Sequence, residues 1–443
     1  MDLFLTGRIS ESGLVKEFKK TGGLNPAVVR SLVFRLTGLA LVFGFQVMLA
    51  RLMGEKHYGH YTVIITVLNV MLMVSTFGLD FSAQRIVPDC IAKGDHSSAN
   101  GFASFSFRLI KVFAIVCSVS VFIFLLFISK RFSISFSEGM FWGILLLPFL
   151  ACIAQASALL RSVNRIKSSL IAAYYAFPVM TGIGCIYYYN SHSKLGVDAV
   201  MLINLVCGAL ICYFVVRHSR KKLIEIAPSE KESISGRKWM SGSGLLFTAF
   251  LPELLMRQTD ILMVSYYLDN GHAGQYAVAA RLATMVALGL AITDQVYLQK
   301  IASYLASKQL LKLQQVVRNA SLQALSIAMP VGFLLIVFGS WLLGFFGDFY
   351  ASAFFPLVIL IAGQLILTAT GMAGSLMKMM GYKKIFFAFG ILALLAQLFL
   401  NRILIHVYGI TGAAIGTTVS LILLNVFAYL FIKRRTKIRA SFL

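Results

Sequence analysis

The stretch HYGHYTV, at residues 57–63, returns 215 positions later as HAGQYAV, at residues 272–278. Three further pairs of similar stretches follow in the same order, at offsets of 213 to 217 residues. These pairs are GLDFSAQR (78–85) with GLAITDQVYLQK (289–300), aligned on Asp80 and Asp294, LLRSVNRIK (159–167) with LMKMMGYKK (376–384), and GVDAV (196–200) with GITGAA (409–414). Each pair alone is weak, because Gly, Tyr and Lys are common at the ends of membrane helices. Four pairs in order indicate an internal duplication of the chain.

The composition of the 443-residue chain is that of a membrane protein, because 58% of its residues are apolar and only 13% are charged. A soluble domain carries about one quarter charged residues. A run of about twenty apolar residues is long enough to cross a bilayer as a helix. Twelve such runs predict an all-α polytopic membrane protein. The predicted spans are residues 31–50, 59–82, 112–129, 139–160, 168–189, 196–216, 240–266, 274–297, 319–343, 352–375, 385–407 and 410–432.

The distribution of basic residues predicts the orientation of these spans. The formal net charge is +23, but Lys and Arg are spread over many loops and form no single patch for a nucleic acid. Only five of the 40 Lys and Arg residues fall in the predicted outer loops, and four fall inside spans. The five are Arg51, Lys56, Lys130, Arg131 and Lys194, and the four are Arg35, Arg257, Arg281 and Arg402. Because cytoplasmic loops carry the excess of positive charge, both termini are predicted to be cytoplasmic.

A polar loop midway along the chain, at residues 217–239, is interpreted as a cytoplasmic linker. It separates an N-terminal lobe of six spans (31–216) from a C-terminal lobe of six spans (240–432). Residues 1–30 and 433–443 are predicted cytoplasmic tails, and the second of them is basic. An even number of spans in each half makes the repeat parallel, so the two lobes are predicted to be related by an axis along the membrane normal.

Several motifs resemble one known family. They are the YGHY…GLD…R series in residues 58–85, the basic loops after the fourth and tenth spans, and YGITGAAIGTTVS at residues 408–420. Over residues 28–432 the chain resembles the polysaccharide-transport branch of the MOP exporter superfamily, the Wzx-type flippases of O-antigen and other lipid-linked oligosaccharides. The resemblance implies a MATE-like, V-shaped pair of six-helix bundles around a central cavity.

The same resemblance implies a function. The substrate would be an undecaprenyl-diphosphate-linked oligosaccharide, moved by alternating access from the inner to the outer leaflet of the bacterial cytoplasmic membrane. The lipid tail would stay among the membrane lipids while the head group crosses through the cavity. Glycan polymerase or other assembly proteins would be partners of such a flippase.

Three charged residues interrupt the apolar stretch FLPELLMRQTDILMVSYYL at residues 250–268: Glu253, Arg257 and Asp260. A charge at the centre of a membrane helix costs about 2.5–3.5 kcal/mol, so it is expected to face the bundle interior or water. The spacings of four and three predict that all three share one helix face. Because a guanidinium stays charged and can hold a phosphate with two hydrogen bonds, Arg257 is our first candidate for binding the diphosphate. Glu253 and Asp260 would balance its charge or couple transport to protons or sodium. The alternative is a salt bridge that only allows Arg257 to be inserted.

Two further arginines are candidates for binding the substrate. Arg281 lies about two turns inside the eighth span and has no acidic residue within four positions. A lone buried cation needs an anion from elsewhere, and this anion would be either Asp260 or the substrate. Arg35 lies one turn inside the first span, where it would either capture the diphosphate from the inner leaflet or extend to the interface.

Candidates for a gate and a hinge follow from the repeat and from one proline. Asp80 and Asp294 occupy equivalent positions near the cytoplasmic ends of the second and eighth spans. Beside basic residues such as Arg85 and Lys300, they would either form an inner gate or only balance charge at the interface. Pro252 removes one backbone hydrogen bond from its helix and is a hinge candidate. The alternative is a simple packing role, because proline is tolerated in membrane helices.

The sequence argues against a metal site, disulfides and enzymatic activity. The six cysteines form no CxxC pair and no histidine lies at a ligand spacing, so no metal and no cofactor is expected. Short outer loops argue against a membrane glycosyltransferase or ligase, and without a GxxxxGK[ST] motif an ABC exporter would need a separate ATPase. The main alternative is a cation-coupled multidrug exporter of the MATE type. Its pocket would hold carboxylates for cationic drugs, and the arginines argue against it.

Overall fold

The computed structural model describes residues 26–132, 138–228, 236–307, 309–370 and 372–436, and the statements below concern these ranges. They are helical apart from short connections. The N-terminal half contains α2 (Pro26–Met53), α3 (Glu55–Thr76), α4 (Leu79–Ala92), α5 (His96–Phe132), α6 (Glu138–Ser162), α7 (Ile166–Leu170), a π-helix η1 (Ile171–Ala176), α8 (Phe177–His192) and α9 (Val197–Ile226). The C-terminal half contains α10 (Gly236–Tyr267), α11 (Asn270–Thr284), α12 (Leu288–Ala306), α13 (Leu310–Gly344), a 3₁₀ turn η2 (Asp348–Ala353), α14 (Phe354–Ala369), α15 (Ala373–Met379), α16 (Lys383–Tyr408) and α17 (Ile410–Thr436).

Within these ranges, 10 helical segments are long and apolar enough to cross a membrane, and they coincide with the first six and the last four predicted spans. The seventh predicted span corresponds to α10, which carries the charged residues, and the eighth is divided between α11 and α12. The second span ends earlier than predicted. Phe77 and Gly78 adopt left-handed conformations (φ 45° and 71°), so α3 stops at Thr76 and α4 starts as a separate helix. The predicted linker is helical at both ends, because α9 continues to Ile226 and α10 begins at Gly236.

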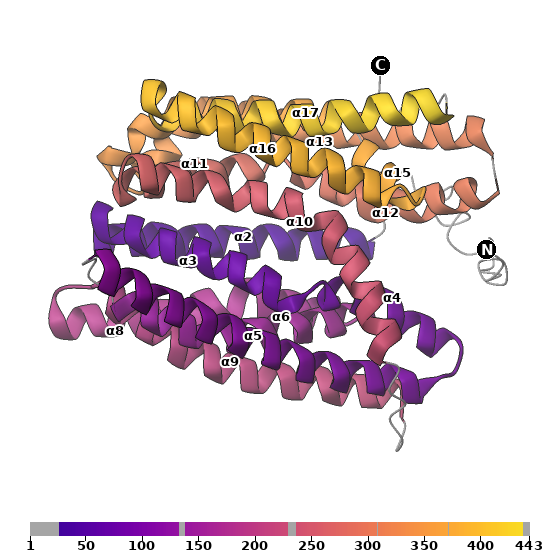
Figure 1. The fold of residues 1–443 in the computed structure, drawn as a ribbon, viewed down its shortest axis with the longest axis horizontal. Helices are drawn as coiled ribbons and strands as arrows, with labels where there is room; N and C mark the ends of the chain where they lie inside the picture. Colours follow the sequence, from indigo (N-terminus) through magenta and orange to yellow (C-terminus); the bar gives the residue numbers. More distant parts are fainter. Residues whose placement is uncertain (1–25, 133–137, 229–235, 308, 371, 437–443) are drawn as a thin grey trace.

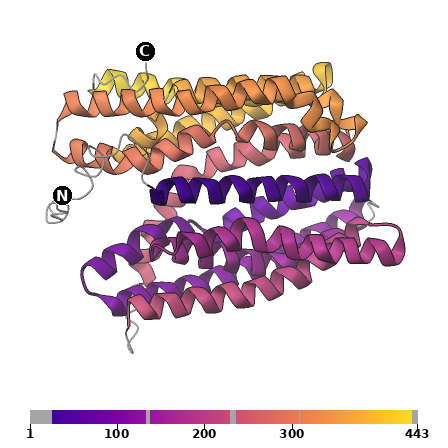
Figure 2. The same cartoon turned by 180° about the vertical axis from the view of Figure 1, so that it is seen from behind.

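The helices form two layers, one from each half of the chain (Figures 1 and 2). α2 begins and α17 ends at the same end of the molecule, which we call the terminus end, and the other end is called the opposite end (Figures 1 and 2). This placement is what an even number of spans requires. The distribution of Lys and Arg predicts that the terminus end is cytoplasmic.

Helix α10 contacts both lobes, as Figure 1 shows. In its first half, Ser243 Oγ donates a hydrogen bond to Ser82 Oγ (2.8 Å), and the ring of Phe250 stacks on that of Phe81 with centroids 5.0 Å apart. Its second half packs against α11 and α16 in the C-terminal lobe. Pro252 is buried between these two halves. A proline at this crossing is placed to let α10 bend when the lobes move, and its hinge role stays a prediction.

We expect Gly390→Val in α16 to destabilise the protein by about 1–3 kcal/mol, because a Cβ at this position would lie 2.7 Å from Pro252 Cβ. A proline ring has no alternative rotamer, so α10 and α16 must move apart. The measurement is the thermal unfolding temperature of the purified protein. Gly242→Val is the matched control, because a Cβ on this α10 glycine meets open space. Equal unfolding temperatures for the two variants would contradict the packing of α10 on α16 at Pro252.

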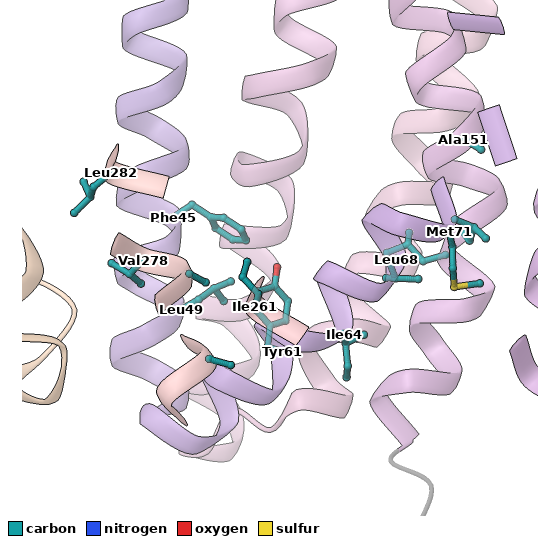
Figure 3. Packing of buried hydrophobic residues seen from close by; sticks show 14 of the residues in the cluster. Phe45, Leu49, Tyr61, Ile64, Leu68, Met71, Ala151, Ile261, Val278 and Leu282 are labelled. Atoms are coloured by element: carbon teal, nitrogen blue, oxygen red, sulfur yellow. The ribbon is translucent and has the colours of Figure 1, made fainter. Parts of the chain in front are cut away.

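The hydrophobic core joins the two lobes toward the opposite end. One cluster of buried side chains combines residues of α2 and α3 with residues of α10, α11 and α14. Figure 3 shows part of it, with Leu49 and Tyr61 close to Ile261 and Val278. A second cluster belongs to the C-terminal lobe alone and includes Ile301, Leu376 and Leu424 of α12, α15 and α17. The terminus-end half of the C-terminal lobe therefore has a core of its own.

Two glycines of the repeat meet where α3 packs against α11. Gly59 and Gly274 are equivalent positions in HYGHYTV and HAGQYAV, and a Cβ added to Gly274 would lie 3.0 Å from Gly59 Cα. A Cβ added to Gly59 would clash with the backbone carbonyl oxygen of Asn270. Equivalent residues that contact each other lie near the axis that relates the two halves. The two copies of the repeat thus contact each other through the backbone at Gly59 and Gly274, where there is no room for a larger side chain.

Candidate functional site

A cavity of about 250 Å³ lies between α2 and the α11–α12 pair, and residues of both lobes line it. Its polar lining residues are Gln46, Arg281 and Thr284, and the remaining lining residues are apolar. Arg281 is the one charged residue in this described lining. A cavity with apolar walls and a single cation concentrates positive potential, so it favours an anionic ligand.

Neutral partners from the N-terminal lobe hold Arg281 at this cavity. Its Nη1 donates hydrogen bonds to Gln46 Oε1 (2.5 Å) and to Tyr58 Oη (3.1 Å). Tyr58 Oη in turn donates to Gln46 Oε1 (3.0 Å). Arg281 forms no ion pair with another described residue. The sequence predicted either Asp260 or the substrate as its anion, and the pairing with Asp260 is wrong. The charge of Arg281 remains available to a ligand.

Arg257 and Glu253 form the predicted ion pair on α10, with Arg257 Nη2 3.4 Å from Glu253 Oε1. The other carboxylate oxygen, Oε2, lies 3.6 Å from Lys378 Nζ of α15. Lys378 is only 16% exposed, and its ammonium lies 4.1 Å and 4.7 Å from the ring centroids of Phe250 and Phe386. In the sequence, Lys378 falls in the basic loop after the tenth predicted span and was not a candidate site residue. The apolar neighbours of Lys378, in LMKMM, could have indicated that this lysine is buried.

Asp260 does not pair with Arg257, contrary to the prediction that two carboxylates balance this arginine. It is 3% exposed, and its Oδ2 accepts hydrogen bonds from Tyr276 Oη (2.7 Å) and Thr417 Oγ1 (3.3 Å). Among the described residues Asp260 is the one charged side chain that is fully buried. The repeat places buried Tyr61 and Asn204 at the positions equivalent to Tyr276 and Thr417. Each lobe therefore has a buried tyrosine and a second buried polar residue at equivalent positions. In the described structure, the C-terminal lobe has in addition the carboxylate of Asp260 at this place.

Of the two aspartates in the predicted gate, the structure describes the side chain of Asp80 only. Asp80 lies in the first turn of α4, where burial raises the pKa of its carboxyl against the opposing effects of the next backbone amide and of the Arg161 guanidinium. Arg161 lies in the last turn of α6, in the same lobe, whereas Arg85, the expected partner, is exposed. This placement favours charge balance within one lobe, and the gate role of Asp80 stays a prediction. The side chains of three other residues considered for the site lie outside the described structure: Arg35, Asp294 and Lys300.

The family follows from comparison with known proteins. The family described as polysaccharide biosynthesis protein matches residues 29–298, which is more than half of the chain. The chain belongs to this family. A curated relative is the probable low-salt glycan biosynthesis flippase Agl15 of Haloferax volcanii. It is 21% identical over 397 residues, which cover 88% of this chain and 80% of the relative.

Solved structures share the fold of this polysaccharide biosynthesis protein at low sequence identity. A point mutant of the Vibrio cholerae MATE transporter VcmN has a TM-score of 0.69 at 14% identity, over 93% of this chain and 96% of the other. Lipid II flippase MurJ in an inward closed conformation has a TM-score of 0.68 at 15% identity, over 91% of this chain and 87% of the other. These likenesses establish the fold. The chain is a multi-pass membrane protein of the MOP superfamily with the predicted MATE-like architecture.

In this polysaccharide biosynthesis protein, an arginine that sequence reasoning did not single out joins the lobes at the opposite end. Arg51, in the last turn of α2, donates from Nε to Phe345 O and from Nη2 to Gly344 O, both at 2.7 Å. Gly344 is the last residue of α13, and its carbonyl oxygen also accepts from the Gly347 N–H (3.2 Å). A cation at this helix end also interacts favourably with the helix dipole. Aromatic rings from both lobes pack beside it: Phe43, Tyr58, Phe346 and Tyr350. The lobes are closed against each other at this end.

Proposed function

We propose that the chain is a flippase for a polyprenyl-diphosphate-linked oligosaccharide. The observation that carries the proposal is Arg281, an arginine that has no acidic partner among the described residues and lies at a cavity lined by both lobes. Membership of the polysaccharide biosynthesis protein family and the flippase name of the curated relative support the same class. We further propose undecaprenol as the lipid, O-antigen or a related surface glycan unit as the sugar, and the bacterial cytoplasmic membrane as the location.

A diphosphate suits this site chemically. Its oxygens only accept hydrogen bonds, and a guanidinium donates parallel N–H groups while it stays charged. In place of Gln46 and Tyr58, Arg281 would gain charge-assisted hydrogen bonds, which are roughly twice as strong as neutral ones. Arg257 and Arg35 are the proposed further contacts of the head group along its path.

The transport cycle that we propose is alternating access. Gly59, Gly274 and Arg51 close the lobes at the opposite end, so the head group enters from the terminus end, the predicted cytoplasmic side. Binding of the anion neutralises the cavity and lets the lobes close there, after which they open outward and release the head group. With the cell interior negative, export of an anion is favoured by about 2.3 kcal/mol per charge per 100 mV.

Return of a proton or sodium ion is a second driving force, and we place it at Asp260 rather than Glu253. Two cations already stabilise the charged form of Glu253. Asp260 has hydroxyl partners, Tyr276 and Thr417, and no cation within ion-pair distance among the described residues. A buried carboxylate without a counter-ion favours the uptake of a positive charge. Asp260 is therefore the better coupling site.

Deletion of the gene separates the flippase from the multidrug exporter. We expect the surface glycan to be lost and the lipid-linked unit to accumulate, as measured by mass spectrometry of extracted lipids, because the glycan polymerase and assembly partners then receive no exported unit. Accumulation of the cationic dye ethidium should stay unchanged, and expression of the chain should restore the glycan. Normal surface glycan together with raised ethidium retention would instead identify a multidrug exporter.

A further inference from the structure

Glu253 lies between two cations that come from different helices. Its Oε1 faces Arg257 Nη2 of α10 at 3.4 Å, and its Oε2 faces Lys378 Nζ of α15 at 3.6 Å. The three side chains together carry one net positive charge. The two cations therefore hold the Glu253 carboxylate, and their remaining positive charge favours an anion that carries more negative charge than a carboxylate.

A carboxylate in this position resembles a phosphate group. Both present negatively charged oxygens that only accept hydrogen bonds, and Arg and Lys are the side chains with which proteins bind phosphate. The two distances exceed the roughly 2.7–2.9 Å of a well-formed charge-assisted hydrogen bond, so Glu253 satisfies neither cation fully. Arg257 is 38% exposed, and Glu253 is 31% exposed. The protein therefore does not enclose the pair, and a ligand has room to reach it.

We propose that Glu253 holds the place of a phosphate group between Arg257 and Lys378, which together form a second anion site, in the C-terminal lobe, for a diphosphate head group. The proposal rests on the proposed flippase function and adds Lys378 as a ligand. When a diphosphate arrives, Glu253 moves away and its two oxygens are replaced by phosphate oxygens. In the empty protein the carboxylate keeps the two cations from repelling each other.

The site also reaches a contact between the lobes. The Lys378 ammonium lies over the ring of Phe250, and the same ring stacks on Phe81 of α4 in the N-terminal lobe. The quadrupole of an aromatic ring attracts a cation that lies over its face, so Lys378 helps to hold Phe250 in this position. Movement of Lys378 toward a diphosphate removes this contribution from Phe250. Occupation of the site thereby weakens a contact that holds α10 against the N-terminal lobe.

Titration of the full-length protein in lipid nanodiscs with inorganic pyrophosphate, at constant ionic strength, tests the site by calorimetry. Glu253→Gln should bind pyrophosphate about fivefold more tightly, because a partly exposed competing carboxylate is removed. Lys378→Gln should bind it about fivefold more weakly, and the loss should be larger in the Glu253→Gln background, where Lys378 is free. Glu55→Gln and Lys384→Gln make the same charge changes at exposed positions outside the cluster and should leave the affinity unchanged.

Three outcomes would overturn the proposal. They are a wild-type protein that binds no pyrophosphate, unchanged affinity in both cluster variants, and equal shifts in the matched controls, which would indicate only a long-range effect of net charge. None of these outcomes depends on the lipid-linked unit. The flippase function is measured separately, by the surface glycan of the deletion strain, so the two proposals can fail independently.

Discussion

Export of the lipid-linked unit falls at least about a hundredfold when Arg281 is replaced by glutamate, if this arginine binds the diphosphate. Hydrogen bonds to a charged group contribute about 1.5–3 kcal/mol, and a carboxylate in the cavity adds repulsion between like charges. Arg281→Lys keeps the charge but loses the planar fork of N–H groups, so it should retain part of the export. The measurement is the surface glycan of a deletion strain that expresses each variant at equal level.

The fold should tolerate the reversal of charge at position 281. Tyr58 Oη, which now accepts from Arg281, can donate to a carboxylate at the same place, so the site keeps a hydrogen bond. Arg402→Glu, at an exposed position of α16, is the matched control for the same change in charge. Tyr58→Phe separates the two roles of Arg281, because it removes a bond to the N-terminal lobe without removing the cation. Normal export by Arg281→Glu would exclude head-group binding at this cavity.

The fold could be predicted from the sequence because a membrane imposes simple requirements. A span needs about twenty apolar residues, and a duplicated chain keeps glycines such as Gly59 and Gly274 where two helices approach closely. Arg281 could be found because a lone charge inside a span is costly and therefore conspicuous. The break between α3 and α4 could not be predicted, because it depends on the left-handed conformation of Phe77. A left-handed residue is usually a glycine, and Phe77 is not.

The partners of the charged residues could not be predicted, because they lie far away in the sequence or carry no charge. Helical spacing places Asp260 near Arg257, but Tyr276 and Thr417 bind its carboxylate from α11 and α17. Lys378 reaches Glu253 across 125 positions, and Arg51 binds backbone carbonyls, which every residue possesses. The packing of the helices determines which partners each of these charged side chains contacts, and this packing cannot be read from the sequence.

Gly59→Val should separate the lobes at the opposite end and favour the outward-open state. A Cβ at this position would clash with the carbonyl oxygen of Asn270, which is backbone and cannot turn away as a side chain would. Overpacking of this kind costs about 1–3 kcal/mol, enough to shift the balance between two states by about fivefold to a hundredfold. The fold within each lobe is untouched, because the clash lies between α3 and the start of α11.

Labelling of the cavity from outside the cell measures this shift. Leu282 lines the cavity, so Leu282→Cys, in a chain whose six native cysteines are replaced by alanine, reports whether an impermeant maleimide can enter. We expect its labelling to rise about tenfold with Gly59→Val, and to rise less with Gly274→Ala, whose added Cβ would lie 3.0 Å from Gly59 Cα. Gly44→Val in α2, where a Cβ meets open space, is the control for a valine in a helix. Equal labelling of the Gly59 and Gly44 variants would mean that the glycine contact does not close the opposite end. Increased labelling together with lost glycan export would show that this end must close again for each transport cycle.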